Sequence, residues 1–194
     1  MNTNSVATNI GNTLMILRTL FALILVATNL RATEPLAPGD AMPALPVAAL
    51  DGTVTTLAKI RGNGPLVLMA WCSSCHSCRE AEGPFNRLAT ECAGKIPVYA
   101  LASNPKETAD AVRARQTQSG VTFPVVLDRD GAVADAFGVT CTTTVLVIAK
   151  DGTLAYRGPL QLGGKTHARN ALKDVIAGKL PAVRDIEQQG CPIR

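Results

Sequence analysis

The chain has 194 residues, enough for one domain with additional segments at its ends. Aromatic residues make up only 4% of the sequence, so the core is expected to consist mostly of aliphatic side chains. The formal net charge is +4 and the basic residues are scattered without a run, which argues against a nucleic-acid partner.

Residues 1–32 have the pattern of a secretory signal peptide. Arg18 precedes an apolar run over residues 19–27, which is too short to span a bilayer comfortably, and Ala32 offers a cleavage site. Met15 is an alternative start, and an uncleaved membrane anchor is the alternative to cleavage. In either case we expect the domain to be exported and to face the periplasm, where disulfides persist.

The remainder divides into an extended leader over residues 33–44, a folded domain over residues 45–180 and a tail over residues 181–194. The domain opens with a predicted hairpin over residues 47–57, because Asp51-Gly52 is a typical hairpin turn. Residues 57–64 are predicted to be a turn that leads into the central strand. Residues 66–71 are a continuous apolar run, as expected for a central strand covered on both faces.

A helix is predicted after this strand, up to Ala93. Strands and helices then alternate, and the chain closes with a strand hairpin and a last helix. The predicted strands cover residues 96–102, 123–127, 145–148 and 154–157, and the predicted helices cover residues 104–119, 132–137 and 166–177.

Three cysteines, Cys72, Cys75 and Cys78, lie at intervals of three where the central strand gives way to the helix. The N-terminus of a helix presents unpaired N–H groups and a positive dipole end, which stabilise a thiolate and lower its pKa. A second thiol one turn along the helix can close a disulfide. The spacing therefore indicates a dithiol redox site, and both Cys72/Cys75 and Cys75/Cys78 satisfy it.

The stretch from Trp71 to Arg79 resembles the thioredoxin-like redoxins of the AhpC/TSA group, especially the TlpA-like periplasmic thiol-disulfide oxidoreductases. The order of elements over residues 45–180 is also similar to that family. The resemblance implies an α/β thioredoxin-like fold, in which helices flank a central mixed sheet and an N-terminal β-hairpin extends it. It also implies that Cys75 is the attacking thiol, that Cys78 is the resolving thiol, and that the two form the redox-active disulfide.

The function implied by this resemblance is disulfide exchange with the thiols and disulfides of partner proteins, including a membrane or periplasmic reductant or oxidant. The redox-active disulfide would serve in place of a bound cofactor. Trp71, Cys72 and His76 are auxiliary candidates, and a charged His76 would stabilise the Cys75 thiolate.

The family carries a cis-proline beside its disulfide, and Thr143 occupies that position here. The Thr142–Thr143 bond is therefore expected to be trans. Cys141 is expected to lie within reach of the dithiol in a more open pocket, and Thr143→Pro is expected to leave the fold intact.

Other functions remain open from the sequence alone. Cys72, Cys75, Cys78 and Cys141 could bind copper or zinc in a metallochaperone-like module. The run from Cys72 to His76 also matches the c-type haem attachment pattern.

Thiol peroxidase activity is a further alternative, although Cys72 stands where peroxiredoxins need Thr or Ser. Cys92 and Cys191 are candidates for a structural disulfide or for inert thiols, and a cysteine in the tail could also act as a relay at a neighbouring active site.

Overall fold

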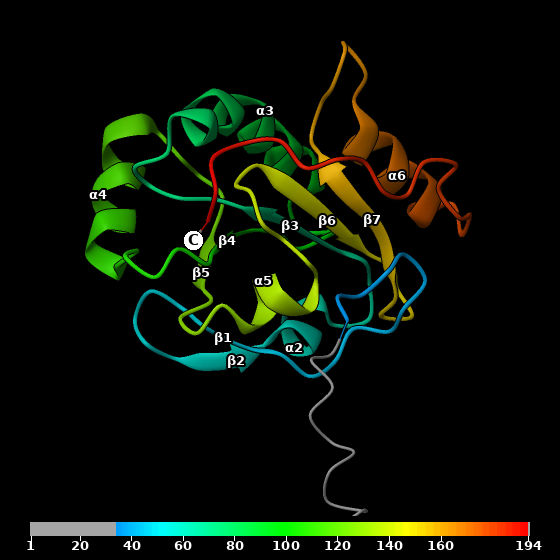
Figure 1. Cartoon of the computed structure of the whole chain (residues 1–194), viewed down its shortest axis with the longest axis horizontal. Helices are drawn as coiled ribbons and strands as arrows, with labels where there is room; N and C mark the ends of the chain where they lie inside the picture. The colour runs from blue at the N-terminus through cyan, green and yellow to red at the C-terminus, as the bar shows by residue number, and fades with distance from the viewer. Residues whose placement is uncertain (1–33, 194) are drawn as a thin grey trace, which may run out of the picture. The chain divides into compact units, whose positions relative to one another are not determined.

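A seven-stranded mixed sheet carries the fold, in the strand order β2-β1-β5-β4-β3-β6-β7 (Figure 1). The computed structural model describes residues 34–193, so the predicted signal peptide lies outside the described residues. The central strands β3, β4 and β5 run parallel, whereas β1, β6 and β7 pair antiparallel with their neighbours. The strands are β1 (Pro46–Ala48), β2 (Val54–Thr56), β3 (Leu66–Ala70), β4 (Val98–Ala102), β5 (Val125–Leu127), β6 (Thr144–Ile148) and β7 (Leu154–Pro159).

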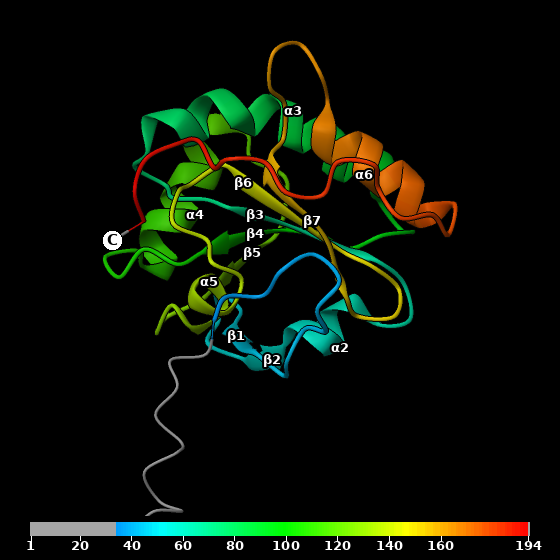
Figure 2. The same cartoon turned by 45° about the vertical axis from the view of Figure 1, so that its right-hand side comes forward.

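Helices cover both faces of the sheet, as Figure 2 shows. Buried side chains of α3, α4 and α6 share one core cluster, and those of α2 and α5 belong to the other. The helices are α2 (Leu57–Arg61), α3 (His76–Cys92), α4 (Ala109–Ser119), α5 (Ala132–Ala136) and α6 (His167–Ile176). This three-layer arrangement is the predicted thioredoxin-like architecture.

The central strand β3 shows why the sheet needs helices on both faces. All five of its residues are buried. Val67 and Met69 pack into the cluster of α3, whereas Leu66 and Leu68 pack into the cluster of α5, as the alternation of side chains along a strand requires. Packing on both faces therefore fixes the position of the C-terminal end of β3. The cysteine motif follows this end directly in the sequence.

Most of the predicted elements are confirmed, and two details are wrong. The hairpin of β1 and β2 forms as predicted and adds to the sheet through the pairing of β1 with β5. Helix α2 occupies a stretch that was expected to be a turn, and Thr56 caps it by accepting from the Lys59 N–H group. Helix α4 begins at Ala109 rather than at residue 104, because Thr108 is its N-cap.

The C-terminal tail is tied to the domain, although it contains no helix. It forms isolated β-bridges between Asp185 and Arg157 and between Pro192 and Cys141. In Figures 1 and 2 the tail, drawn in red, runs back from α6 towards α3. Ile193 is buried in the core cluster of α5, which anchors this end of the described chain.

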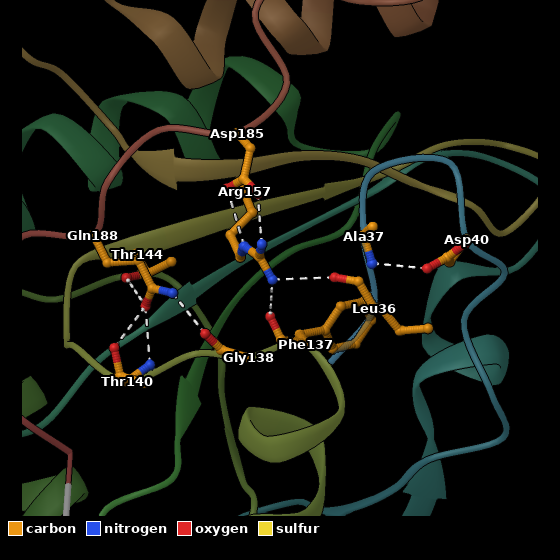
Figure 3. A network of polar contacts seen from close by, with 10 residues as sticks. All are labelled: Leu36, Ala37, Asp40, Phe137, Gly138, Thr140, Thr144, Arg157, Asp185 and Gln188. Atoms are coloured by element: carbon orange, nitrogen blue, oxygen red, sulfur yellow. Dashed lines mark hydrogen bonds and ion pairs between the residues drawn. The ribbon is translucent and has the colours of Figure 1, made fainter. Parts of the chain in front are cut away.

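Arg157 of β7 ties together three segments that are distant in sequence (Figure 3). Its guanidinium donates to the Asp185 carboxylate in the tail, with distances of 3.1 and 2.5 Å. It also donates to the carbonyl oxygen of Leu36 at 3.1 Å and to that of Phe137 at 2.8 Å. One side chain therefore satisfies a carboxylate and two backbone acceptors.

Among residues 34–193, no helix has both the length and the apolar character needed to cross a membrane.

Arg157→Met is expected to lower the free energy of unfolding by about 2 kcal/mol, because it leaves a carboxylate and two carbonyl groups without their donor. Urea denaturation should show a lower midpoint with an unchanged slope. Arg129→Met at an exposed site is the matched control and should change stability by less than about 0.5 kcal/mol. Equal midpoints for the two variants would contradict this role of Arg157.

Candidate active site

The redox motif lies where β3 ends and α3 begins. Cys75 is the N-cap residue of α3, and its N–H group donates to the Cys72 carbonyl oxygen at 3.3 Å. Glu107 holds the intervening turn, since its carboxylate accepts from the Ser73 N–H group at 2.8 Å and from the Ser73 hydroxyl at 2.6 Å. The turn therefore places Cys75, rather than Cys72, at the N-terminus of the helix.

Cys75 is nearly buried, with 7% of its surface exposed, and hydrogen bonds surround its thiol. The Thr142 hydroxyl lies 3.2 Å from its sulfur atom. Burial by itself would raise the pKa of Cys75, but hydrogen bonds from Cys191, Thr142 and Cys78 outweigh it and lower the pKa to about 7. A large share of Cys75 is therefore thiolate at neutral pH.

Cys78 has the opposite character. It is fully buried, and burial raises the pKa of its thiol far above the ordinary value, with the nearby Cys75 adding to the effect. Its sulfur accepts from the Cys72 N–H group at 3.3 Å. The pair thus consists of one thiol that ionises readily and one that keeps its proton, as an attacking and a resolving thiol require.

Trp71 fixes helix α3 to the end of β3. Its indole N–H donates to the Glu82 carboxylate at 3.3 Å, and its ring packs edge-to-face on Phe123. The same buried carboxylate accepts two hydrogen bonds from the Arg115 guanidinium, at 3.0 and 2.6 Å. Trp71 therefore orients the helix that carries both cysteines.

The other auxiliary candidates lie away from the reacting sulfur. The His76 side chain is 82% exposed, and its Nε2 atom lies 3.5 Å from the Glu80 carboxylate. The Cys72 thiol is buried, contacts the Ser74 hydroxyl at 3.3 Å and has a raised pKa because of burial. Cys141 Sγ accepts from the Thr140 hydroxyl, and the hydroxyl beside the Cys75 sulfur belongs to the neighbouring Thr142.

Thr143 corrects one expectation about the loop. Its peptide bonds are trans, as predicted, but its backbone has φ of +64°, in the left-handed region. Its N–H group donates to the Ala70 carbonyl oxygen at 2.7 Å, at the end of β3. Proline has no N–H group and a φ near −65°, so this geometry argues against the expectation that Thr143→Pro leaves the fold intact.

Sequence reasoning missed three contributors to the site, namely Thr142, Glu107 and Cys191. Glu107 was expected in the first turns of a helix, although it lies before α4 and clamps the Ser73 turn. Thr142 is one of three consecutive threonines, and the sequence does not show which of them lies beside Cys75. Cys191 was noted in the tail, but no periodic pattern indicated where the tail would bind.

The geometry gives little support to a metal or haem. Within the described residues, no group of three or more His, Cys, Asp and Glu side chains is placed to hold a metal ion, so the proposed cysteine set does not form a ligand shell. Cys72 and Cys75 are both buried while His76 is exposed, which does not suit the attachment of a porphyrin.

The fold and the dithiol at the start of α3 define a thioredoxin-like thiol-disulfide oxidoreductase. The family model described as AhpC/TSA family matches residues 38–157, and the chain belongs to that family. It is 33% identical to the thiol-disulfide oxidoreductase ResA of Geobacillus thermodenitrificans, over 60% of this chain and 66% of the relative. It is 30% identical to ResA of Geobacillus kaustophilus, over 71% of this chain and 83% of the relative.

Solved structures share the fold at lower identity. A hypothetical protein of Sinorhizobium meliloti superposes with a TM-score of 0.72 at 24% identity, covering 81% of this chain and 94% of that one. A secreted disulfide oxidoreductase of Mycobacterium tuberculosis superposes with a TM-score of 0.50 at 18% identity, covering 57% of this chain and 80% of that one. These similarities support the thioredoxin-like architecture.

The alkylation rate of Cys75 by iodoacetamide is expected to rise with pH through a midpoint near 7, because only the thiolate reacts. Thr142→Val removes one donor to that thiolate, which should raise the pKa by about one and slow alkylation at pH 7 about fivefold. Mass spectrometry of the Cys75 peptide follows the reaction. Thr90→Val, at the far end of α3, is the control; a midpoint that stays the same in Thr142→Val would contradict the role of this hydroxyl.

Thr143→Pro is expected to lower the free energy of unfolding by about 3 kcal/mol or more, because it forbids the observed φ and removes the N–H bond to Ala70. Thr143→Gly keeps the N–H group and adopts positive φ freely, so its effect should stay within about 1 kcal/mol. Thermal unfolding of both variants checks the comparison. Equal stability of Thr143→Pro and the wild type would show that the loop does not need its left-handed residue.

Proposed function

We propose that this protein exchanges disulfides with partner proteins, with Cys75 as the attacking thiol and Cys78 as the resolving thiol. The observation that supports the proposal is the difference in pKa and burial between the two thiols. Cys75 has a pKa of about 7 at the N-cap of α3, whereas Cys78 is fully buried one turn further along and stays protonated. This difference supports the proposed order of the two steps.

The first step is the attack of the Cys75 thiolate on one sulfur of a partner disulfide. An S–S bond forms between Cys75 and the partner, the partner disulfide breaks, and its second sulfur leaves as a thiolate. Cys78 then loses its proton and attacks the Cys75 sulfur. The Cys75–Cys78 disulfide forms and the partner departs with two thiols, so that the partner is reduced and this protein is oxidised; the reverse sequence oxidises a partner.

A hollow beside the dithiol provides room for the partner chain. It has a volume of about 300 Å³, and its lining includes Ser77 in the first turn of α3, Thr143 and Gly190. Ser77 lies between Cys75 and Cys78 in the sequence and its hydroxyl is 3.6 Å from the Cys191 sulfur, which supports binding of a partner chain on this side of the start of α3. Because no large charged surface run occurs in the sequence, we expect the partner to be selected by its backbone and by small side chains near its disulfide.

The compartment we propose is the periplasm or the outer surface of the membrane. The support comes from the apolar N-terminal segment over residues 19–27, which follows Arg18 as in a secretory signal. The similarity to a secreted disulfide oxidoreductase agrees with this assignment.

Cys75→Ser is expected to lower the rate of insulin disulfide reduction by at least about 100-fold, because serine cannot form the mixed disulfide. Cys72→Ala is the matched cysteine control and should retain at least about half of the rate, since Cys72 lies before the helix and has a raised pKa. Turnover with dithiothreitol as the reductant measures both variants. If Cys72→Ala abolished turnover and Cys75→Ser did not, the reactive pair would be Cys72/Cys75.

A further inference from the structure

The described part of the chain brings a third thiol to the reacting sulfur. Cys191 of the tail is among the groups that lower the pKa of Cys75, and its sulfur lies 3.6 Å from the Ser77 hydroxyl in the first turn of α3. The N–H group of Cys191 donates to the Thr142 hydroxyl at 3.0 Å, and this hydroxyl lies 3.2 Å from the Cys75 sulfur. Cys75 and Cys191 therefore lie on the same threonine hydroxyl, one through its sulfur and the other through its backbone N–H group.

The backbone of the tail holds Cys191 in this place. The Thr142 N–H group donates to the Cys191 carbonyl oxygen at 2.8 Å, and the Ile193 N–H group donates to the Thr140 carbonyl oxygen at 2.9 Å. Gly190 permits the close approach, since a Cβ atom there would lie 2.1 Å from the Thr142 carbonyl oxygen. The φ of Gly190 is +141°, which also disfavours other residues.

Gln188 adds a second anchor, as Figure 3 shows. Its side-chain oxygen accepts from the Thr140 N–H group at 2.9 Å, and its amide donates to the Gly138 carbonyl oxygen at 2.6 Å. Together with the Arg157–Asp185 ion pair, these contacts bind the tail at several points before it reaches the dithiol. An accidental contact of a loose tail would not involve so many specific hydrogen bonds.

We propose that Cys191 is a second resolving thiol, which forms a disulfide with Cys75 inside the same chain. The inference rests on the proposed function, because it begins from the mixed disulfide between Cys75 and a partner. Cys78 is fully buried, whereas Cys191 is only half-buried, so Cys191 is the more accessible of the two residues.

In the proposed step the Cys191 thiol gives up its proton and its sulfur attacks the Cys75 sulfur of the mixed disulfide. The Cys75–Cys191 bond forms, the bond between Cys75 and the partner breaks, and the partner sulfur leaves with the electron pair and takes up a proton. Cys78 can then attack Cys75, which releases Cys191 as a thiol and forms the Cys75–Cys78 disulfide. The two steps together transfer two electrons to the partner, the same total as direct resolution by Cys78.

The test uses the full, reduced chain carrying Cys78→Ser, which removes the first resolving thiol. One equivalent of the aromatic disulfide DTNB is added, free thiols are alkylated, and the peptides are mapped by mass spectrometry without reduction. The expected main product is the peptide pair linked by Cys75 and Cys191. In the double variant Cys78→Ser/Cys191→Ser, the thionitrobenzoate adduct should instead remain on Cys75.

Cys78→Ser/Cys141→Ser is the matched control, because Cys141 pairs with the tail through its backbone but has its sulfur beside Thr140. It should give the same linked product as Cys78→Ser alone. A lasting adduct on Cys75 in Cys78→Ser, with Cys191 alkylated as a free thiol, would overturn the proposal for Cys191 and leave the proposed function in place. If Cys75 gained no adduct in any variant, the proposed function itself would fail.

A backbone variant tests whether the binding of the tail matters. In the Cys78→Ser background, Gly190→Ala should slow the formation of the Cys75–Cys191 link by at least about tenfold, because it separates the tail from Thr142. Gly164→Ala, at another glycine with positive φ but open space around it, should leave the rate within about twofold. Equal rates for the two variants would contradict the role of the bound tail.

Discussion

The site depends on keeping a negative charge on a nearly buried sulfur atom. Burial disfavours the thiolate of Cys75, so hydrogen-bond donors must offset the lost contact with water. These donors come from the first turn of α3, from the loop before β6 and from the tail. Because the donors come from three segments, the position of each segment affects the pKa of the Cys75 thiol.

A buried ion pair between Glu82 and Arg115 fixes the position of α3, whose first turn carries the dithiol. Glu82 binds Arg115 of α4 and the Trp71 indole at once, so the start of α3 keeps a fixed relation to the end of β3. A buried pair of this kind adds little net stability by itself, but removing one partner leaves an uncompensated charge. The pair thus makes the geometry of the dithiol sensitive to the position of α4.

The sequence predicted what depends on local patterns. The apolar run of β3 and the turn residues of the hairpins predicted the strands, because each is visible within a few residues. The cysteine spacing predicted a dithiol at the end of β3 but left open which of two cysteine pairs reacts. The placement of Thr142 and Cys191 beside Cys75 was not visible, since it follows from contacts between residues far apart in the chain. The conformation of Thr143 was missed for a related reason, because a positive φ at a threonine has no local signal and is maintained by its bonds to Ala70 and Gln189.

The loop over residues 140–144 and the tail behave as one structural unit. Each supplies hydrogen bonds to the other, as the pairs Thr142 with Cys191 and Thr143 with Gln189 show. Suppose that this loop were transplanted, without the tail, into a relative that carries proline there. The left-handed Thr143 would then lack the Gln189 carbonyl oxygen that accepts its hydrogen bond. A chimera between such proteins would therefore have to transfer both segments together, even though the bonded residues are 46 and 49 positions apart in the sequence.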